Sequence, residues 1–387
     1  MTNVLSRFLA ALAVGLLAGC LFNGSGGGGG SPTVPDPGPV VIEPPPPVVL
    51  PSMVAYITGT GLHDLTAFDV DPTTGALTQI AAPIPAGFSP MDVVVDPLGG
   101  FAYVAALDSL AVRSYRLDPP SRAPAFAGES SPEFQVRRLA VHPSGRFVYA
   151  ADEAGDRIAM FGVDGTTGEL TPLVPGTVPT GRVPYSVMVH PNGRFAYVAN
   201  SGEDTIGVYA VDETTGVLTE IPGNLFTLPA EAALPFVLAI DPKGEFAYLG
   251  STGAGSERIS LFAVDSTTGV LTLLGTPLGF GGQNPEDIAV HPSGKFVYVV
   301  VGIEDLVSAF ARVGNTLTYV GSFEVGESPS AVAVDVTGKF AYVTNTNDHT
   351  ISIFSINETT GALTPRGEPF ALPAGHFPRS IAIAEKK

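Results

Sequence analysis

The chain has 387 residues, of which 45% are hydrophobic and only 14% are charged. This composition suits many buried strands and excludes a disordered polymer. The formal net charge of −18 repels nucleic-acid phosphates and anionic lipid headgroups, so neither nucleic-acid binding nor a basic membrane patch is expected. With a single cysteine, Cys20, a disulfide within the chain is excluded.

The N-terminus has the pattern of a targeting segment. Arg7 precedes the apolar stretch 8–17, which is too short to span a membrane and typical of a signal-peptide core. It ends in Leu-Ala-Gly-Cys20, which resembles the lipobox of bacterial lipoproteins; the alternative is a stray cysteine in an ordinary signal peptide. The resemblance implies that residues 1–19 are a lipoprotein signal peptide and that Cys20 carries the lipid. Two or three acyl chains give stable attachment, so we expect a lipid-anchored, extracytoplasmic protein of the cell envelope, at the outer membrane or cell surface.

Residues 20–51 are first rich in glycine and then in proline. Glycine-rich chains are flexible and proline-rich chains are extended. This segment is therefore predicted to be a tether between the anchor and the folded part.

From residue 52 onward one sequence unit recurs: an apolar run, His/Asp-Pro-x-Gly, Phe-x-Tyr-Val, a second apolar run and Asp-x-Thr-Thr-Gly-x-Leu-Thr. Successive copies of its tyrosine are 44 to 51 residues apart, at Tyr56, Tyr103, Tyr149, Tyr197, Tyr248, Tyr298 and Tyr342. A period near 45 that is built only from strands and turns is typical of propeller blades.

One copy predicts the four strands of a blade. We name them A to D, at Val187–Val189, Phe195–Asn200, Ile206–Asp212 and Val217–Ile221. Tight turns join A to B and C to D, where proline sets φ and glycine allows a left-handed residue. Each copy is therefore expected to form a four-stranded antiparallel sheet.

The two ends of the repeat array complement each other. The first copy, 53–80, lacks strand A, whereas the chain ends with an isolated A strand, 381–383. Pairing the C-terminal strand with the N-terminal three removes the open edges. We therefore predict an all-β fold, a closed seven-bladed β-propeller spanning residues 52–387.

The antiparallel order places A–B and C–D turns at one end of the ring, and B–C loops with D–A connectors at the other. His142, His190 and His291 occupy A–B turns where other copies have aspartate, which indicates turn capping. His63, His349 and His376 lie at the opposite end. Together with Arg379 they could form a site for acid–base catalysis, metal binding or anion capture; the alternative is three solvated loop histidines.

Three further candidates adjoin the innermost strands and could point into the central channel: Arg138, Glu286 and Arg379. The chain has no glycine-rich phosphate loop, zinc-spaced Cys/His set, nucleophile elbow or EF-hand loop. No cofactor and no bound metal are therefore expected. The loop end is predicted to receive a small molecule, a glycan or a protein.

The segments Pro-Ser-Gly-Arg-Phe-Val-Tyr and Gly-Lys-Phe-Ala-Tyr-Val-Thr-Asn resemble the YVTN-type propellers, and the Thr-Thr-Gly hairpins resemble the seven-bladed lactonase family. That family includes bacterial 6-phosphogluconolactonases and fungal carboxy-muconate lactonizing enzymes. The resemblance covers residues 53–387 and implies the fold strongly. It rests mostly on strand and turn residues.

Lactonases of this family tend to carry Pro-His where an inner strand begins, with Arg and Glu nearby. Here the corresponding prolines are followed by Met91, Tyr185, Phe236, Glu286, Ser330 and Arg379, and never by histidine. The loop at 154–158, Ala-Gly-Asp-Arg-Ile, is similar in style to the Gly-x-Asp-Arg loop of the family. Two functions follow: a binding module in the cell envelope, which the sequence reasoning prefers, and a lactone hydrolase with a rearranged catalytic set as the alternative.

Overall fold

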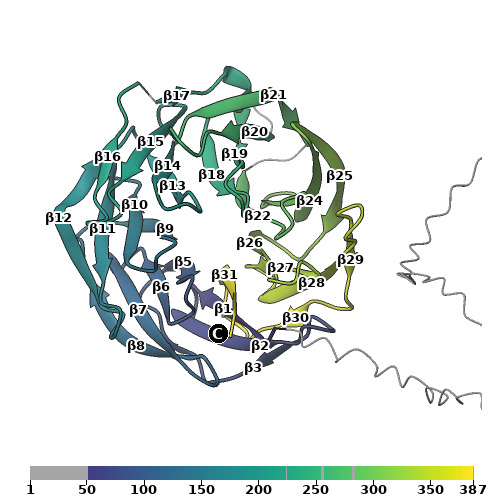
Figure 1. Cartoon of the computed structure of the whole chain (residues 1–387). Helices are drawn as coiled ribbons and strands as arrows, with labels where there is room; N and C mark the ends of the chain where they lie inside the picture. The colour runs from purple at the N-terminus through teal and green to yellow at the C-terminus, as the bar shows by residue number, and fades with distance from the viewer. Residues whose placement is uncertain (1–50, 224, 254–256, 281–283, 387) are drawn as a thin grey trace, which may run out of the picture. The chain divides into compact units, whose positions relative to one another are not determined.

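A computed structural model describes residues 51–223, 225–253, 257–280 and 284–386. The predicted signal peptide, Cys20 and the tether up to residue 50 lie outside these residues. The repeats form seven antiparallel sheets arranged around one axis, as Figure 1 shows. The predicted seven-bladed propeller is confirmed.

Four strand positions make each blade. The inner A strands surround the axis and, from blade 1 to blade 7, are β31 (Pro378–Glu385), β5 (Pro90–Val95), β9 (Val136–Val141), β13 (Pro184–Val189), β18 (Pro235–Ile240), β22 (Pro285–Val290) and β26 (Pro329–Val334). The B strands are β1 (Met53–Gly59), β6 (Phe101–Ala106), β10 (Phe147–Asp152), β14 (Phe195–Asn200), β19 (Phe246–Ser251), β23 (Phe296–Val301) and β27 (Phe340–Asn345).

The outer half of each blade is less regular. The C strands are β2 (Asp64–Val70), β7 (Ala111–Asp118), β11 (Arg157–Val163), β15 (Thr205–Val211), β20 (Arg258–Val264), β24 (Leu306–Val313) and β28 (Thr350–Ile356). Four D strands are continuous: β8 (Ala123–Ser130), β12 (Leu170–Pro179), β21 (Leu271–Gly279) and β25 (Thr316–Glu324). In blades 1, 4 and 7 strand D is interrupted and forms two short pieces: β3 (Leu77–Gln79) and β4 (Ile84–Pro85), β16 (Leu218–Glu220) and β17 (Phe226–Thr227), and β29 (Leu363–Pro365) and β30 (Phe370–Ala371). A single 3-10 turn, η1 (Ala230–Ala232), is the one helical element among the described residues.

The ring closes through blade 1 as predicted. The last strand, β31, pairs antiparallel with β1 from Met53↔Glu385 to Gly59↔Pro378, and the sheet order is β3-β2-β1-β31. Closure covers the edge that an open array would expose.

The hydrophobic core lies between the blades. Seven clusters of buried side chains each join two neighbouring blades. The repeated tyrosine belongs to these interfaces and is buried in every copy. In five blades its hydroxyl donates to a carbonyl in the C–D loop of the next blade, for example from Tyr149 to Gly216 at 2.8 Å and from Tyr298 to Gly361 at 3.1 Å. The repeat thus encodes contacts between blades as well as the strands themselves.

The three turn histidines confirm the predicted capping role. His142 Nδ1 accepts the amide of Ser144 at 3.1 Å, while its Nε2 donates to the carbonyl of Gly193 in the next blade at 2.8 Å. His190 and His291 make the same pair of contacts. Burial lowers the pKa of His190, in agreement with a neutral structural imidazole.

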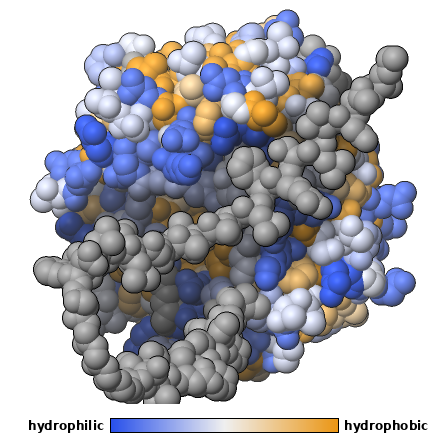
Figure 2. Space-filling model, turned by 45° about the vertical axis from the view of Figure 1, so that its right-hand side comes forward, coloured by the Kyte–Doolittle hydropathy of each residue, from blue (hydrophilic) through white to orange (hydrophobic). Residues whose placement is uncertain are grey.

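In Figure 2, hydrophilic residues on the visible side of the propeller are interspersed with smaller hydrophobic groups. Within the described part of the chain no helix has the length and apolar character needed to cross a membrane.

Candidate functional site at the mouth of the central channel

The site begins with an irregularity that all seven inner strands share. Where each A strand starts, the register with strand B shifts by one residue, so the second residue of the A strand has no partner. Such β-bulges redirect side chains and are common beside active sites. The bulge residues are Arg379, Met91, Arg137, Tyr185, Phe236, Glu286 and Ser330, from blade 1 to blade 7. They lie at the end of the ring that carries the B–C loops and D–A connectors, which we call the loop face.

The residue after the bulge links neighbouring blades. Asp92 Oδ2 accepts the amide of Leu139 at 2.9 Å, and Asp287 Oδ2 accepts the amide of Val332 at 3.0 Å. Ser186 and Ser380 make equivalent contacts with the next blade. Three blades do not make this contact, because their residues at this position have no side-chain acceptor atom: Val237 in blade 5, Ala331 in blade 7 and Arg138 in blade 3.

Arg138 instead spans the channel. Its Nη2 donates to the carbonyl of Glu286 in blade 6 at 2.7 Å, and its Nη1 lies 3.6 Å from Asp92 Oδ1 and 3.8 Å from Asp287 Oδ1. The two carboxylates raise the pKa of Arg138 in spite of its burial, so this guanidinium is charged at all relevant pH values.

Arg379 and Glu286 form the second ionic contact of the channel mouth. Arg379 Nη2 donates to Glu286 Oε2 at 2.9 Å, from blade 1 to blade 6. About a fifth of each side chain is exposed, 20% and 22% respectively, so both can meet a ligand. The structure therefore brings together the three residues that the sequence placed at the channel: Arg138, Glu286 and Arg379.

Asp287 has the electrostatic character of a proton acceptor. Burial raises its pKa from the ordinary aspartate value of 3.8 to about 6, while the neighbouring Arg138 opposes that rise. Its side chain still has 18% exposure. At pH 7 the carboxylate is mostly ionised yet basic enough to take a proton.

A cavity of about 190 Å³ occupies this part of the channel, and Asp92, Arg138, Ser186, Asp287 and Ser380 are among its lining residues. The opposite end of the channel is different, because its hollow of about 610 Å³ is lined mainly by valine, alanine and isoleucine. Among the described residues, no group of three or more His, Cys, Asp or Glu side chains is arranged to hold a metal ion.

An aromatic shelf extends from the mouth. The Arg137 guanidinium lies 4.3 Å from the centre of the Tyr185 ring and donates to its hydroxyl. Tyr185 in turn packs edge-to-face against Phe236, with ring centres 5.0 Å apart. All three are bulge residues of consecutive blades, so the shelf is a continuation of the same ring of positions.

His63 and His349 have a different role from the one expected. In blades 3, 4 and 6 the last B–C loop residue is Asp156, Asp204 or Asp305; each has positive φ and accepts the amide that precedes the proline of the next inner strand, at 2.7–2.8 Å. His63 Nδ1 and His349 Nδ1 occupy the same position and accept the equivalent amides of Ser89 and Phe377 at 3.4 and 3.3 Å. Both histidines therefore fasten loops to connectors.

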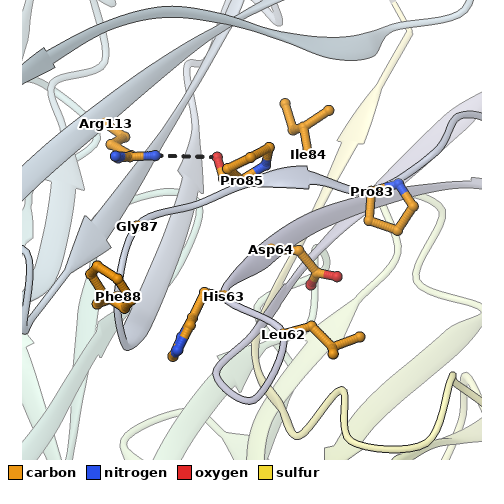
Figure 3. A pocket seen from close by; sticks show the side chains of 9 residues that line it. All are labelled: Leu62, His63, Asp64, Pro83, Ile84, Pro85, Gly87, Phe88 and Arg113. Carbon is orange, nitrogen blue, oxygen red and sulfur yellow. Dashed lines mark hydrogen bonds between the residues drawn. The ribbon is translucent and has the colours of Figure 1, made fainter.

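Figure 3 shows His63 in its own surroundings, beside the ring of Phe88 and turned away from the Asp64 carboxylate. The groove drawn there has a volume of about 410 Å³, larger than the channel cavity. Its charged groups are already engaged, since Arg113 pairs with Glu129 at 2.7 Å and Asp64 pairs with His376. We therefore place the chemistry in the channel and not in this groove.

His376 is not on an accessible rim. It is fully buried, and its Nε2 lies 3.1 Å from Asp64 Oδ1 and 3.5 Å from Thr66 Oγ1, both in β2. No contact among the described residues joins two of the histidines His63, His349 and His376. The expected histidine cluster is thus replaced by three separate structural contacts.

From the sequence, Asp92, Arg137 and Asp287 were expected on the loop face only as charged residues, and neither they nor Tyr185 and Phe236 were chosen as site residues. A signal was available, because all of them stand one or two residues after the start of an inner strand, where the copies differ most from one another.

These features define a closed seven-bladed propeller with a charged pocket at one end of its axis. The sequence model of the "Lactonase, 7-bladed beta-propeller" family matches residues 54–183, 172–284 and 276–377. The chain belongs to this family.

Individual curated relatives match this chain over shorter stretches than the family model does. A 6-phosphogluconolactonase of Pectobacterium carotovorum is 26% identical over 140 residues, which are 35% of this chain and 42% of the relative. A 6-phosphogluconolactonase of Formosa agariphila is 30% identical over 73 residues, 19% of this chain and 20% of the relative. The matched regions thus span less than half of these curated relatives.

Solved structures share the whole fold. A periplasmic gluconolactonase of Pseudomonas aeruginosa superposes with a TM-score of 0.74 at 19% identity, covering 87% of this chain and all of that one. A Lactobacillus plantarum protein gives a TM-score of 0.74 at 20% identity with the same coverage. At such identities the likeness concerns the fold alone.

Proposed function

We propose that the protein is a lactone hydrolase whose reaction centre is the loop-face mouth of the central channel. The observation that carries the proposal is the cluster of Arg138, Arg379, Glu286 and Asp287 from three blades, in a propeller of the lactonase family. The family assignment favours this function over the binding module preferred from the sequence. The cluster supplies both a positive partner for a carbonyl oxygen and a carboxylate base.

Lactone hydrolysis needs a water to attack the ring carbonyl. A base takes one proton of the water as its oxygen bonds to the carbonyl carbon, and the carbonyl oxygen becomes an oxyanion. The tetrahedral intermediate then collapses, the bond between that carbon and the ring oxygen breaks, and the ring oxygen receives the proton. The product is the open hydroxy acid.

We assign the base role to Asp287. Its pKa of about 6 allows it to be ionised at neutral pH and then to hold and return a proton. Its Oδ2 accepts the amide of Val332, its Oδ1 lies 3.8 Å from Arg138 Nη1, and both Asp287 and Arg138 line the cavity. This carboxylate takes the place of the Pro-His histidine that the family resemblance led us to look for.

We assign to Arg379 the stabilisation of the oxyanion that forms on the lactone carbonyl oxygen. A guanidinium has five N–H donors in a fixed fork, and the contact with Glu286 uses one Nη. Glu286 holds this fork in place from blade 6, two blades away around the ring, while Arg138 fixes the Glu286 backbone. A positive group that is positioned before the reaction lowers the barrier without reorganisation.

The test measures hydrolysis of five- and six-membered lactones by the full chain. The reaction is monitored through the proton that the acid product releases into a lightly buffered indicator solution. Because lactones also open spontaneously, the rate without protein is subtracted at each pH. We expect saturable hydrolysis that Arg379→Ala slows by about 10²- to 10³-fold. Rates equal to the spontaneous rate for every lactone would contradict the proposal.

We also propose that this activity is extracytoplasmic, on a protein anchored through Cys20 after removal of residues 1–19. The support is the sequence Leu17-Ala18-Gly19-Cys20 and the Gly/Pro-rich segment that follows. Mass spectrometry of the membrane-extracted protein should find a diacylated N-terminal Cys20, and Cys20→Ser should release it from membranes. Retention of the unprocessed Met1 would contradict the anchor.

A further inference from the structure

We infer that the channel mouth selects uncharged lactones and disfavours phosphorylated or carboxylated ones. This inference rests on the proposed function and adds the substrate class. It is carried by the charges of the inner strands and of the loops through which a ligand must pass.

Among the described residues, each positive side chain of the inner strands at the mouth already lies beside a carboxylate. The inner strands contain three positive side chains among the described residues, Arg137, Arg138 and Arg379. Arg379 pairs with Glu286 at 2.9 Å, and Arg138 lies between Asp92 and Asp287. Arg137 is the third, and its Nη1 lies 3.4 Å from Glu153 Oε2. Three arginines thus face four carboxylates.

A phosphate ester carries nearly two negative charges at pH 7. Sites that bind such groups supply arginine forks or lysines without a competing carboxylate, or backbone amides at a helix N-terminus. Here a phosphate would have to displace a carboxylate from its arginine and leave that carboxylate unpaired near the channel. A neutral lactone needs only one N–H of Arg379 for its carbonyl, and this requires no such displacement.

The approach to the mouth is also negative. The B–C loops contain nine Asp or Glu and no Lys or Arg, over residues 60–63, 107–110, 153–156, 201–204, 252–257, 302–305 and 346–349. One of the nine, Glu257, is buried and its pKa is raised by burial, so it contributes least. The D–A connectors add three carboxylates and only Arg182, over residues 86–89, 131–135, 180–183, 228–234, 280–284, 325–328 and 372–377. This arrangement of charge lowers the local concentration of anions and slows their association.

The test compares 1,5-gluconolactone with its 6-phosphate on the full chain. At about 20 mM ionic strength we expect kcat/KM to favour the neutral lactone at least ~10-fold, because unscreened loop carboxylates repel the phosphate. At 0.5 M salt the ratio should shrink several-fold as screening takes over. A preference for the phosphate at low salt, or a ratio independent of salt, would overturn the inference while the proposed function stands.

If neither of these two lactones is turned over, charge selection is measured by binding alone. Calorimetry with 1,5-gluconolactam and its 6-phosphate needs no reaction. The neutral lactam should bind more tightly, with the same salt dependence; tighter binding of the phosphate would overturn the inference.

A single variant tests whether the discrimination against phosphorylated lactones arises at the channel mouth. Glu153→Gln removes the partner of Arg137 and frees one cation at the mouth, so kcat/KM for the phosphorylated lactone should rise about 3- to 10-fold, with less than a twofold change for the neutral one. Glu129→Gln is the matched control, since it removes the partner of Arg113 away from the channel and should shift neither substrate. An equal response of both variants would contradict the assignment.

Discussion

Two sets of positions at the loop face behave in opposite ways. At the last residue of the B–C loops, His63 and His349 replace aspartates and make the same contact to a connector amide. At the bulge of the inner strands, Arg379, Glu286 and Arg137 replace one another without a common contact. Within a repeat protein, a position that keeps its contact in spite of a changed residue is scaffold. A position where the contacts diverge is where a function can be built.

The largest expected effect comes from the proposed base. Asp287→Asn retains an acceptor for the amide of Val332 but cannot take a proton, so kcat should fall by about 10²- to 10⁴-fold. In the unmodified protein kcat/KM should rise with pH through an inflection near 6, because the base acts only when ionised. The measurement is the pH–rate profile of both proteins. An unchanged profile in the variant would exclude Asp287 as the base.

The second-largest effect is expected at Arg379, the proposed partner of the oxyanion. Arg379→Ala should lower kcat by about 10²- to 10³-fold, since it removes a donor that is positioned for the transition state. Arg379→Lys keeps the charge but loses the fork, and should recover only part of the rate. Urea unfolding of both variants checks that the ring is intact. Full activity of the alanine variant would move the reaction centre elsewhere.

Scaffold contacts should affect stability and not turnover. Tyr298→Phe removes the hydrogen bond from the Tyr298 hydroxyl to Gly361 in the next blade and should lower the free energy of unfolding by about 1 kcal/mol. Tyr103→Phe is its matched control, because that buried hydroxyl has no partner among the described residues; its loss should cost close to nothing. Equal losses in denaturant titrations would show that the inter-blade bond is not the cause.

The smallest effect is expected where the sequence suggested catalysis. His349→Asp introduces the residue that blades 3, 4 and 6 have at this position, so it should change kcat/KM by less than twofold and preserve stability. His63→Asp should behave in the same way. A loss of turnover above tenfold in either variant, with stability unchanged, would restore the histidine hypothesis.

Strand order, ring closure and turn capping could be predicted because they depend on local patterns that recur with a fixed period. The placement of Arg138, Glu286 and Arg379 beside the channel also followed from their positions in the repeat. The roles of Asp92 and Asp287 could not be predicted in this way. They depend on which blades face each other across the axis and on one arginine spanning the channel, neither of which is a local property.

The contacts of the three loop histidines could not be predicted for a related reason. His63, His349 and His376 are brought to one region by ring closure, but their partners are set by backbone geometry. Positive φ at His63 and His349 directs each ring to a connector amide, and His376 is buried beside Asp64 and Thr66 of β2. Residue type alone does not distinguish an imidazole that accepts an amide from one that is available to a ligand.

A structure of the full chain with a bound lactam, the unreactive amide analogue of a six-membered lactone, tests the central claim most directly. We expect the lactam at the channel mouth, with its carbonyl oxygen on the Arg379 guanidinium and its carbonyl carbon facing Asp287. A lactam bound instead in the groove beside His63, with the mouth unchanged, would contradict it.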